Sequence, residues 1–258
     1  MSTRTPLSFY VLTKNSEQYL DEILSRVEPV VDEIVVVDSG SMDNTEKIVS
    51  KYSKAKFLYR SFDNFKNQRN YAADACLYDY VFFLDSDEIP SFELIECLQK
   101  VKENGFEVYA YQVKRKWEAL GKDVHAIYPV QSPDTPFRLI NKQFVRFAEN
   151  SNRVHETPSG FDSCATLDGY LIHKTFQTKQ ELKRKLEHYT DIAALDLINS
   201  GKTINWLKQT ISPIGAFIKW YILMDGYKDG RVGLIFGRYA YSYTKEKYRK
   251  ARKEIKKM

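Results

Sequence analysis

The chain has 258 residues, of which 43% are hydrophobic and 28% are charged, and its formal net charge is +5 at pH 7. This length suits one large α/β domain with an elaboration, or two small domains, and the composition excludes a disordered chain. Pro213 and Lys219 interrupt the most apolar stretch, residues 211–224, and the N-terminus becomes polar too early for a signal peptide, which predicts a cytoplasmic protein without a membrane span.

The first hundred residues alternate between strand-like and helix-like patterns. The apolar spacing predicts strands at residues 7–12, 34–37, 56–59 and 80–84, and helices at residues 16–27, 43–52, 67–77 and 91–103. Asp43 and Glu46 have the spacing of a capping box at the start of the second helix. This βαβαβαβ order predicts a mostly parallel sheet with right-handed crossovers.

The pattern changes after residue 104. It predicts strands at residues 107–117 and 167–173, a hairpin at 137–147, a Pro-rich loop at 121–137, and a long helix from Thr178 to Gly201. We therefore divide the chain into an α/β domain over residues 1–175, with halves of about 1–104 and 105–175, and a helical region over residues 176–258.

The helical C-terminal region is basic and aromatic. From Lys245 to Met258 it carries eight Lys or Arg residues against two Glu residues. Such a charge run favours an anionic partner such as phospholipid headgroups, lipid phosphate or nucleic acid, although a solvated helix explains it as well. Aromatic residues such as Trp220 and Tyr241 suit a membrane interface or core packing. Without a nucleic-acid-binding motif, we expect no nucleic-acid partner.

Three carboxylates follow the fourth predicted strand. Asp85, Asp87 and Glu88 come directly after residues 80–84, where open α/β sheets bind their ligands. Because side chains alternate along a strand, Asp85 and Asp87 can point the same way. Two carboxylates held close together suit Mg²⁺ or Mn²⁺, whose coordination is completed by phosphate oxygens. The alternative is a turn or a helix start, since Ser91 is a typical N-cap residue.

Polar residues also follow the first two strands. Thr13 and Asn15 follow the first strand, and Asp38 and Ser41 follow the second. Carboxyl ends of parallel strands converge on one crevice, so we expect these residues to be neighbours of Asp85. The glycine-rich motifs of dinucleotide-binding and P-loop proteins are both absent from the sequence, which leaves those two classes unsupported.

Four segments in order, residues 12–15, 36–45, 68–70 and 84–88, resemble the motifs of family 2 glycosyltransferases of the GT-A fold. More narrowly, the chain is similar to bacterial lipopolysaccharide-core β-glucosyltransferases, which residues 153–156 also fit. The resemblance implies a Rossmann-like, mostly parallel sheet with flanking helices and a C-terminal helical appendage. It also implies an inverting, metal-dependent transfer from a nucleotide sugar, usually a UDP sugar. Residues 1–104 would bind that donor, and residues 105–175 the acceptor.

The resemblance implies roles for particular residues. The expected contacts to the nucleotide sugar are Thr13, Asn15, Glu17, Asp38, Ser41, Lys66, Arg69, Asp85 and Ser86. Asp87 is the expected main ligand of a divalent cation, Mn²⁺ or Mg²⁺, and His173 is a second candidate ligand. A histidine at a strand end can equally be a structural group.

An inverting transfer needs a base to take the proton of the acceptor hydroxyl. The resemblance implies a carboxylate after the strands of the second half, where Glu156 of His155-Glu156 is the first candidate and Asp134 the second. The chain departs from the family pattern in lacking a plain Glu-Asp pair in that region. A turn-capping role for Glu156 is the alternative.

We therefore expect an enzyme that acts on a lipid-linked or lipopolysaccharide acceptor as a peripheral protein at the inner face of the inner membrane. The basic C-terminal region would contact the anionic membrane surface. Two further readings stay open, a polyprenyl-phosphate glycosyltransferase and a non-catalytic protein that binds nucleotide sugars.

Overall fold

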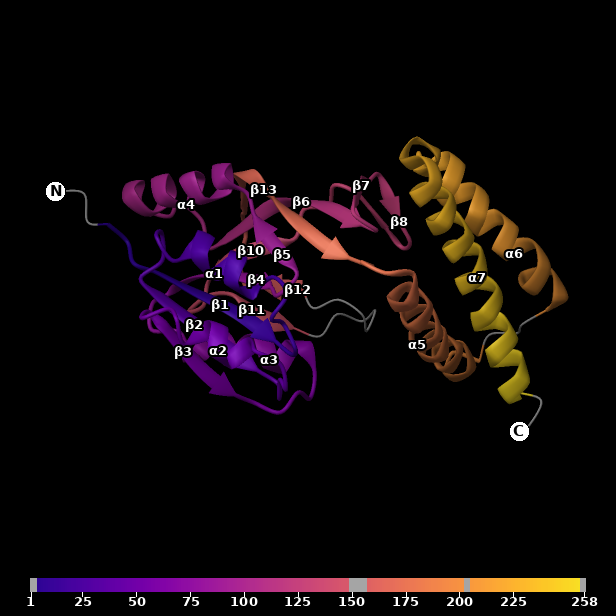
Figure 1. The fold of residues 1–258 in the computed structure, drawn as a ribbon, viewed down its shortest axis with the longest axis horizontal. Coiled ribbons are helices and arrows are strands. Elements are labelled where there is room, and N and C mark those ends of the chain that lie inside the picture. The colour runs from indigo at the N-terminus through magenta and orange to yellow at the C-terminus, as the bar shows by residue number, and fades with distance from the viewer. Residues whose placement is uncertain (1–3, 149–156, 202–204, 256–258) are drawn as a thin grey trace. The chain divides into compact units, whose positions relative to one another are not determined.

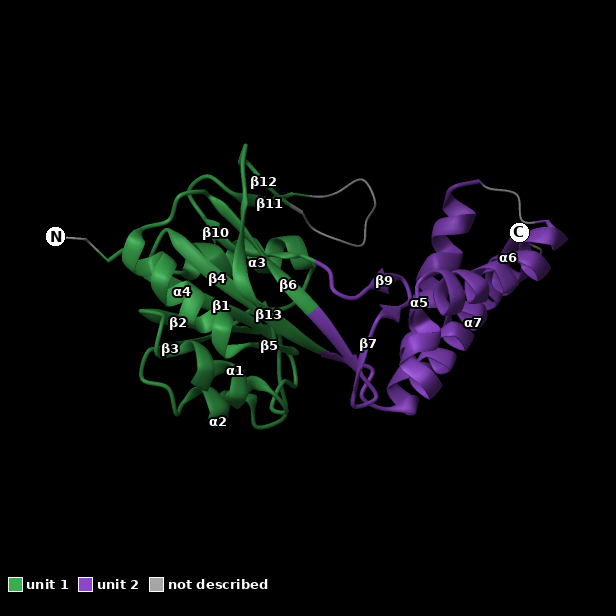
Figure 2. Cartoon of the chain, turned by 90° about the horizontal axis from the view of Figure 1, so that it is seen from above, with its two compact units in different colours: residues 1–115, 135–173 green, residues 116–134, 174–258 purple. Residues whose placement is uncertain are grey.

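The computed structural model describes residues 4–148, 157–201 and 205–255 (Figure 1). The chain forms two compact units, of which the first comprises residues 1–115 and 135–173 and the second residues 116–134 and 174–258 (Figure 2). Residues 116–134 thus group with the helical region, whereas the division made from the sequence kept them with the acceptor half.

The first unit has the alternating order that the sequence predicts. In chain order it contains β1 (Leu7–Thr13), α1 (Leu20–Val27), β2 (Glu33–Asp38), α2 (Thr45–Val49), β3 (Ala55–Tyr59), α3 (Phe65–Ala75), β4 (Tyr80–Asp85), β5 (Glu88–Pro90), α4 (Phe92–Asn104), β10 (Phe137–Asn141), β11 (Arg146–Ala148) and β12 (Thr157–Ser159). Strands β6 (Ala110–Ala119) and β13 (Ala165–Thr175) begin in the first unit and end in the second.

The first four strands of the main sheet are parallel, and the fifth joins them in the antiparallel direction. Its strand order is β3-β2-β1-β4-β10-β6-β13-β5. Strands β3, β2, β1 and β4 run parallel, and in β1 Leu12 lies opposite Val37 of β2 and Asp85 of β4. Strand β10 pairs antiparallel with β4. The predicted parallel α/β sheet is confirmed, and its register brings the ends of β1, β2 and β4 to one edge.

Two cores cover the two faces of this sheet because neighbouring residues of a strand point in opposite directions. Phe9 of β1 belongs to a buried cluster with residues of α1, α2 and α4, whereas Tyr10 belongs to another with residues of α3 and β11. The Tyr10 ring stacks on Phe83 of β4, with centroids 5.2 Å apart. Helices on both faces explain why the β2 run Ile34–Val37 is apolar throughout.

Three local predictions were wrong. The predicted hairpin at residues 137–147 does not form, because β10 pairs with β4 and β6 whereas β11 pairs with β12. The capping box of Asp43 and Glu46 does not form, because Asp43 Oδ1 accepts hydrogen bonds from the backbone N and Oγ1 of Thr45 (3.0 and 2.5 Å). The predicted loop at residues 121–137 contains the short strands β7 (Lys122–Val124), β8 (Ala126–Ile127) and β9 (Val130–Gln131). These strands are too short to leave a periodic pattern in the sequence.

The second unit is mainly helical. It contains α5 (Lys179–Asn199), α6 (Trp206–Ile218), the π-helical turn η1 (Lys219–Leu223), the short 3-10 helix η2 (Gly226–Asp229) and α7 (Gly230–Ile255). Its core joins apolar residues of α7, such as Phe236 and Tyr239, to Phe176 and to residues of β6 and β7. None of the helices within the described residues combines the length and apolar character that a membrane crossing requires.

Candidate active site

Asp38 joins the end of β1 to the end of β2. Its carboxylate is buried and accepts hydrogen bonds from Thr13 Oγ1 (2.8 Å), Ser41 Oγ (2.5 Å) and the backbone N atoms of Gly40 (2.8 Å) and Ser41 (2.7 Å). Burial alone raises the pKa of Asp38, but the hydrogen bonds from Ser41, Thr13 and Gly40 outweigh burial and lower it. Asp38 is therefore a fixed carboxylate at neutral pH.

Asn15 and Glu17 tie the loops after β1 and β2 together. The backbone N of Asn15 donates to Ser41 Oγ (2.7 Å), and Asn15 Oδ1 accepts from the backbone N of Met42 (2.9 Å). Asn15 has a φ of 52°, a left-handed conformation that Asn tolerates better than most residues. Glu17 Oε2 accepts hydrogen bonds from the backbone N and Nδ2 of Asn44 (3.0 and 2.7 Å). Asn15 and Glu17, both predicted to contact the nucleotide sugar, are thus exposed residues that connect the two loops at this edge of the sheet.

Asp85, at the end of β4, lies between two arginines. Its Oδ1 is 2.7 Å from Arg69 Nη2, and its Oδ2 is 3.1 Å from Arg138 Nη2. Burial raises the pKa of Asp85, but the Arg69 and Arg138 charges outweigh it and lower that pKa. The next residue, Ser86, accepts a hydrogen bond from Ser16 Oγ (2.9 Å), which links β4 to the loop after β1. The three predicted strand ends therefore meet.

Phe83 lies beneath both of these arginines. Its ring centroid is 5.7 Å from the guanidinium carbon of Arg69 and 5.6 Å from that of Arg138. The ring centroid of Phe147 in β11 lies 5.8 Å from the guanidinium carbon of Arg69. These cation–π contacts hold the guanidinium groups against the sheet, so the two positive charges are fixed beside the carboxylates that follow β4.

Glu88 is the centre of this charge cluster, and the sequence analysis assigned it no role. Its side chain is 0% exposed and accepts hydrogen bonds from Arg138 Nε and Nη2 and from Arg115 Nη1, each at 2.6 Å. It also accepts from the backbone N of Asp85 (3.2 Å). Burial raises the pKa of Glu88, but Arg138, His173 and Arg115 outweigh it and hold that pKa well below its usual range.

The two predicted metal ligands are neighbours. Asp87 Oδ2 is 3.5 Å from His173 Nε2, and the Asp87 side chain is 38% exposed against 13% for His173. Burial lowers the pKa of His173, but Asp87 and Glu88 outweigh burial and raise it. Asp87 is the most exposed of the three carboxylates after β4, because Asp85 is 28% and Glu88 is 0% exposed.

Asp87 and His173 suit a cation that is also bound by phosphate oxygens better than a cation held by protein ligands alone. Among the described residues, no group of three or more His, Cys, Asp or Glu side chains is arranged to hold a metal ion. Mg²⁺ is usually bound through one or two carboxylates, with water and phosphate oxygens completing its shell. Asp87 with His173 offers such a partial set.

Of the two candidate bases, the structure describes only Asp134. Glu156 lies outside the described residues. Asp134 Oδ1 accepts a hydrogen bond from Trp117 Nε1 (3.0 Å), and both residues belong to the second unit. Lys66, the remaining predicted donor contact, is a half-buried residue in the first turn of α3.

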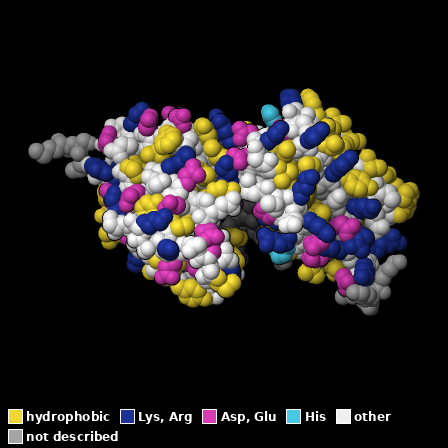
Figure 3. Space-filling view, in the orientation of Figure 1, with side chains coloured by type: hydrophobic (Ala, Val, Ile, Leu, Met, Phe, Trp, Pro, Cys, Tyr) yellow, Lys and Arg dark blue, Asp and Glu magenta, His cyan; other side chains and the backbone are white. Residues whose placement is uncertain are grey.

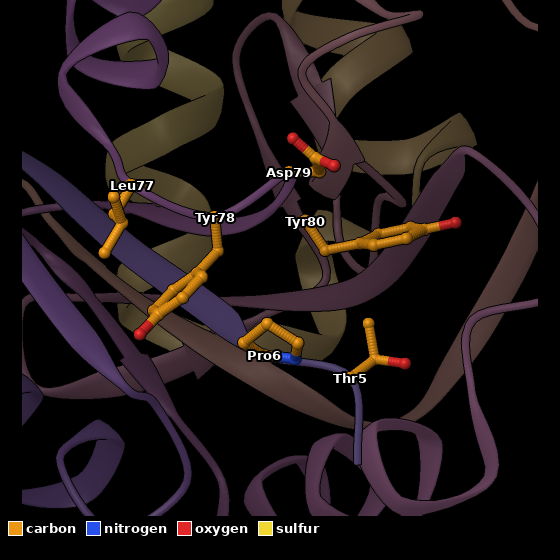
Figure 4. Close-up of a pocket in the computed structure, with 6 residues that line it drawn as sticks. All are labelled: Thr5, Pro6, Leu77, Tyr78, Asp79 and Tyr80. Atoms are coloured by element: carbon orange, nitrogen blue, oxygen red, sulfur yellow. The ribbon is translucent and has the colours of Figure 1, made fainter. Parts of the chain in front are cut away.

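A pocket lies at the opposite edge of the parallel strands, near the amino ends of β1 and β4 (Figure 4). Its lining residues are Thr5, Pro6, Leu77, Tyr78, Asp79 and Tyr80. None of them is a predicted site residue. The polar cluster at the carboxyl ends of the strands is therefore the candidate site, as expected for an open α/β sheet.

Two relatives that match most of this chain are named as glycosyltransferases. LpsC, a lipopolysaccharide core biosynthesis glycosyltransferase of Rhizobium meliloti, is 28% identical over 242 residues, covering 91% of this chain and 87% of LpsC. A protein named as an uncharacterized glycosyltransferase in Rickettsia felis is 26% identical over 242 residues, covering 88% and 84% of the two chains.

A solved structure supports the fold. The crystal structure of S. aureus TarS 1-349 in complex with UDP-GlcNAc has a TM-score of 0.50 and 18% sequence identity, covering 95% of this chain and 92% of that chain. The GT-A architecture that we expected is confirmed. The model of glycosyl transferase family 2 matches residues 8–166, more than half of the chain. This chain therefore belongs to glycosyl transferase family 2.

Proposed function

We propose that this protein is an inverting, metal-dependent glycosyltransferase that moves a sugar from a UDP donor to a lipid-anchored saccharide such as the lipopolysaccharide core. The observation that carries the proposal is the state of the residues after β4. The Asp87 side chain is 38% exposed and lies 3.5 Å from His173 Nε2, whereas Asp85 is 28% and Glu88 0% exposed. An open carboxylate at this edge of the sheet suits a cation that is shared with a diphosphate.

The residues around Asp38 would hold the nucleoside. Asp38 is ionised and fixed by Thr13, Ser41 and Gly40, so its carboxylate is in position for the base or ribose once a ligand group replaces one of these donors. Asn15, Glu17 and Ser86 would border the same ligand, and Asp85 with Arg69 would lie on its sugar side. A preorganised polar site of this kind lowers the cost of binding.

Asp87 and His173 would hold the cation, either Mn²⁺ or Mg²⁺. The bound cation supplies positive charge that stabilises the leaving diphosphate. The acceptor hydroxyl must lose a proton as it attacks. Glu156 is our proposed base for that proton, and Asp134 is the second candidate.

The acceptor assignment is supported by the similarity to LpsC. We propose that the protein works as a peripheral protein on the cytoplasmic face of the inner membrane, where a lipid-anchored saccharide would be presented to it. The net charge of +5 and the basic C-terminal region support attraction to anionic lipid.

The test is Asp87→Asn, which keeps the side-chain size and removes the charge. We expect loss of UDP-sugar turnover and of Mn²⁺-dependent UDP binding by calorimetry, with an unchanged circular dichroism spectrum. Asp79→Asn is the matched control, because Asp79 is an exposed carboxylate at the other end of the same strand. Undiminished transfer by Asp87→Asn contradicts the proposal.

Two further results would favour the other readings. Full activity of both Glu156→Gln and Asp134→Asn favours a polyprenyl-phosphate acceptor, which needs no strong base. UDP binding without turnover of any UDP sugar favours a non-catalytic binding protein.

A further inference from the structure

Helix α6 and the turn η1 carry an exposed apolar stripe. It consists of Leu207, Ile211, Ile214, Ile218 and Ile222, whose side chains are between 42% and 57% exposed. The spacing of three or four residues places the first four on one face of α6, a helix with 3.6 residues per turn, and Ile222 follows four residues later in the π-helical turn η1. Five aliphatic side chains in a row on a solvent-facing surface form an unusually continuous apolar face for a water-soluble helix.

The stripe is a second apolar face, because the other side of the same segment already packs within the second unit. Trp220 of η1 is buried, and its ring lies 5.4 Å from the Tyr128 ring in an edge-on contact. A Cβ atom on Gly237 of α7 would lie 3.0 Å from Tyr221 and 3.1 Å from Phe217. Helix α7 therefore approaches the inner side of this segment closely and leaves the stripe outside.

The surroundings of the stripe are strongly basic. Residues 206–255 contain eleven Lys or Arg residues and four Asp or Glu residues, an excess of seven positive charges. Lys208 and Lys219 lie about 90° around the helix from the centre of the stripe, and Lys219 is exposed. In Figure 3, hydrophobic side chains gather over α6, with Lys and Arg side chains beside them over α7.

We propose that the apolar stripe of α6 and η1 docks on an anionic phospholipid bilayer and lies in its interface. The aliphatic side chains would enter the boundary between headgroups and acyl chains, as in interfacial amphipathic helices. The long side chains of Lys208 and Lys219 can lie along this surface and reach the lipid phosphates. This inference rests on the proposed function for its biological context, a lipid-anchored acceptor.

Charge decides between a bilayer and a second copy of the chain. Two copies that met through the stripe would bring two regions with seven excess positive charges each into contact, and like charges repel. An anionic bilayer reverses the sign of this interaction, because each Lys or Arg near its surface is attracted to it.

The experiment is co-flotation of the full chain with vesicles at several salt concentrations. We expect binding to vesicles of phosphatidylglycerol and phosphatidylethanolamine, weaker binding to phosphatidylcholine vesicles, and weakening by salt. The double variant Ile214→Gln/Ile218→Gln should bind at least about tenfold less tightly, because two half-exposed isoleucines lose their transfer into lipid. These side chains are exposed, so we expect the folded circular dichroism spectrum to be kept.

The matched control is Leu77→Gln, compared with the single variant Ile214→Gln. Leu77 is 70% exposed in the first unit, so it tests whether any exposed apolar side chain matters. Vesicle binding that is absent, or equal for the double variant and the unsubstituted protein, overturns the proposal. A dimer that the double variant abolishes, with no vesicle binding, assigns the stripe to a second copy instead.

A second measurement, Mn²⁺-dependent UDP binding by the unsubstituted protein, distinguishes a failure of this inference from a failure of the proposed function. Vesicle binding without UDP binding contradicts the donor proposal and leaves the membrane surface standing. UDP binding without vesicle binding contradicts the membrane surface and leaves the donor proposal standing.

Discussion

Glu88→Gln tests whether the charge cluster behind the candidate active site is necessary for the fold. The glutamine side chain has nearly the same volume but keeps only one acceptor oxygen. Its new NH₂ group would face the N–H donors of Arg138 and Arg115, which are now 2.6 Å from the carboxylate. The substitution therefore removes the negative charge that these two guanidinium groups share.

The expected loss follows from burial. Breaking a fully buried ion pair by removing one partner costs about 3–5 kcal/mol, because an uncompensated charge is left in the interior. Glu88 is 0% exposed, so solvent cannot screen this loss. Asp85 remains as a second partner of Arg138 (3.1 Å), which places our expectation near the middle of that range, at about 4 kcal/mol.

Glu22→Gln is the matched control. Glu22 also pairs with an arginine, Arg26, at 2.6 Å, but its side chain is 46% exposed. An exposed pair of this kind contributes about 0.2–1 kcal/mol. Two ion pairs of equal length are therefore expected to differ severalfold in their contribution to stability.

The assay is urea unfolding followed by far-ultraviolet circular dichroism. With a slope of about 2 kcal/mol per molar urea, the Glu88→Gln midpoint should fall by about 2 M. Tryptophan fluorescence reports the second unit separately, since Trp117, Trp206 and Trp220 all belong to it. A loss below about 1 kcal/mol, or one equal to that of Glu22→Gln, refutes the reasoning from burial.

Three further predictions concern single side chains. The pKa of Asp38 is lower in the folded state than in the unfolded chain, so its contribution to stability is complete above about pH 4 and is lost as the pH falls through the folded pKa. The difference in unfolding free energy between the unsubstituted protein and Asp38→Asn should therefore shrink below about pH 4, and a constant difference from pH 7 to pH 3 contradicts this. Burial raises the pKa of the Cys76 thiol to about 12, whereas Cys164 is exposed, so a maleimide should label Cys164 in the native protein and Cys76 only after unfolding, as read by mass spectrometry. Gly169→Ala should destabilise the first unit by more than about 1 kcal/mol in urea unfolding, because Gly169 has a φ of +91° and an added Cβ would lie 2.3 Å from the backbone N of Leu94; a stability equal to that of the unsubstituted protein would show that this contact relaxes freely.

The local structure of the first unit could be predicted from the sequence. The apolar runs of β2 and β4 and the amphipathic spacing of α1 reflect interactions of each segment with its two neighbouring layers, and these leave a periodic pattern. Ser91 caps α4 with a hydrogen bond from the backbone N of Leu94 (3.2 Å), as its residue type predicts. The meeting of Asp38, Ser86 and Asp87 at one edge follows from strand direction alone.

Other features depended on the tertiary structure. Glu88 of β5 pairs with Arg115 of β6 and Arg138 of β10, which lie 27 and 50 residues further along the chain. Only the order β10-β6-β13-β5 brings these strands together. The sequence shows the apolar residues 211–224, but packing against α7 decides which of them face inward and which form the exposed stripe. A periodic pattern records whether a segment has an apolar face. It does not record which distant side chain meets that face or pairs with its charges, because that contact exists only once the strands and helices have assembled.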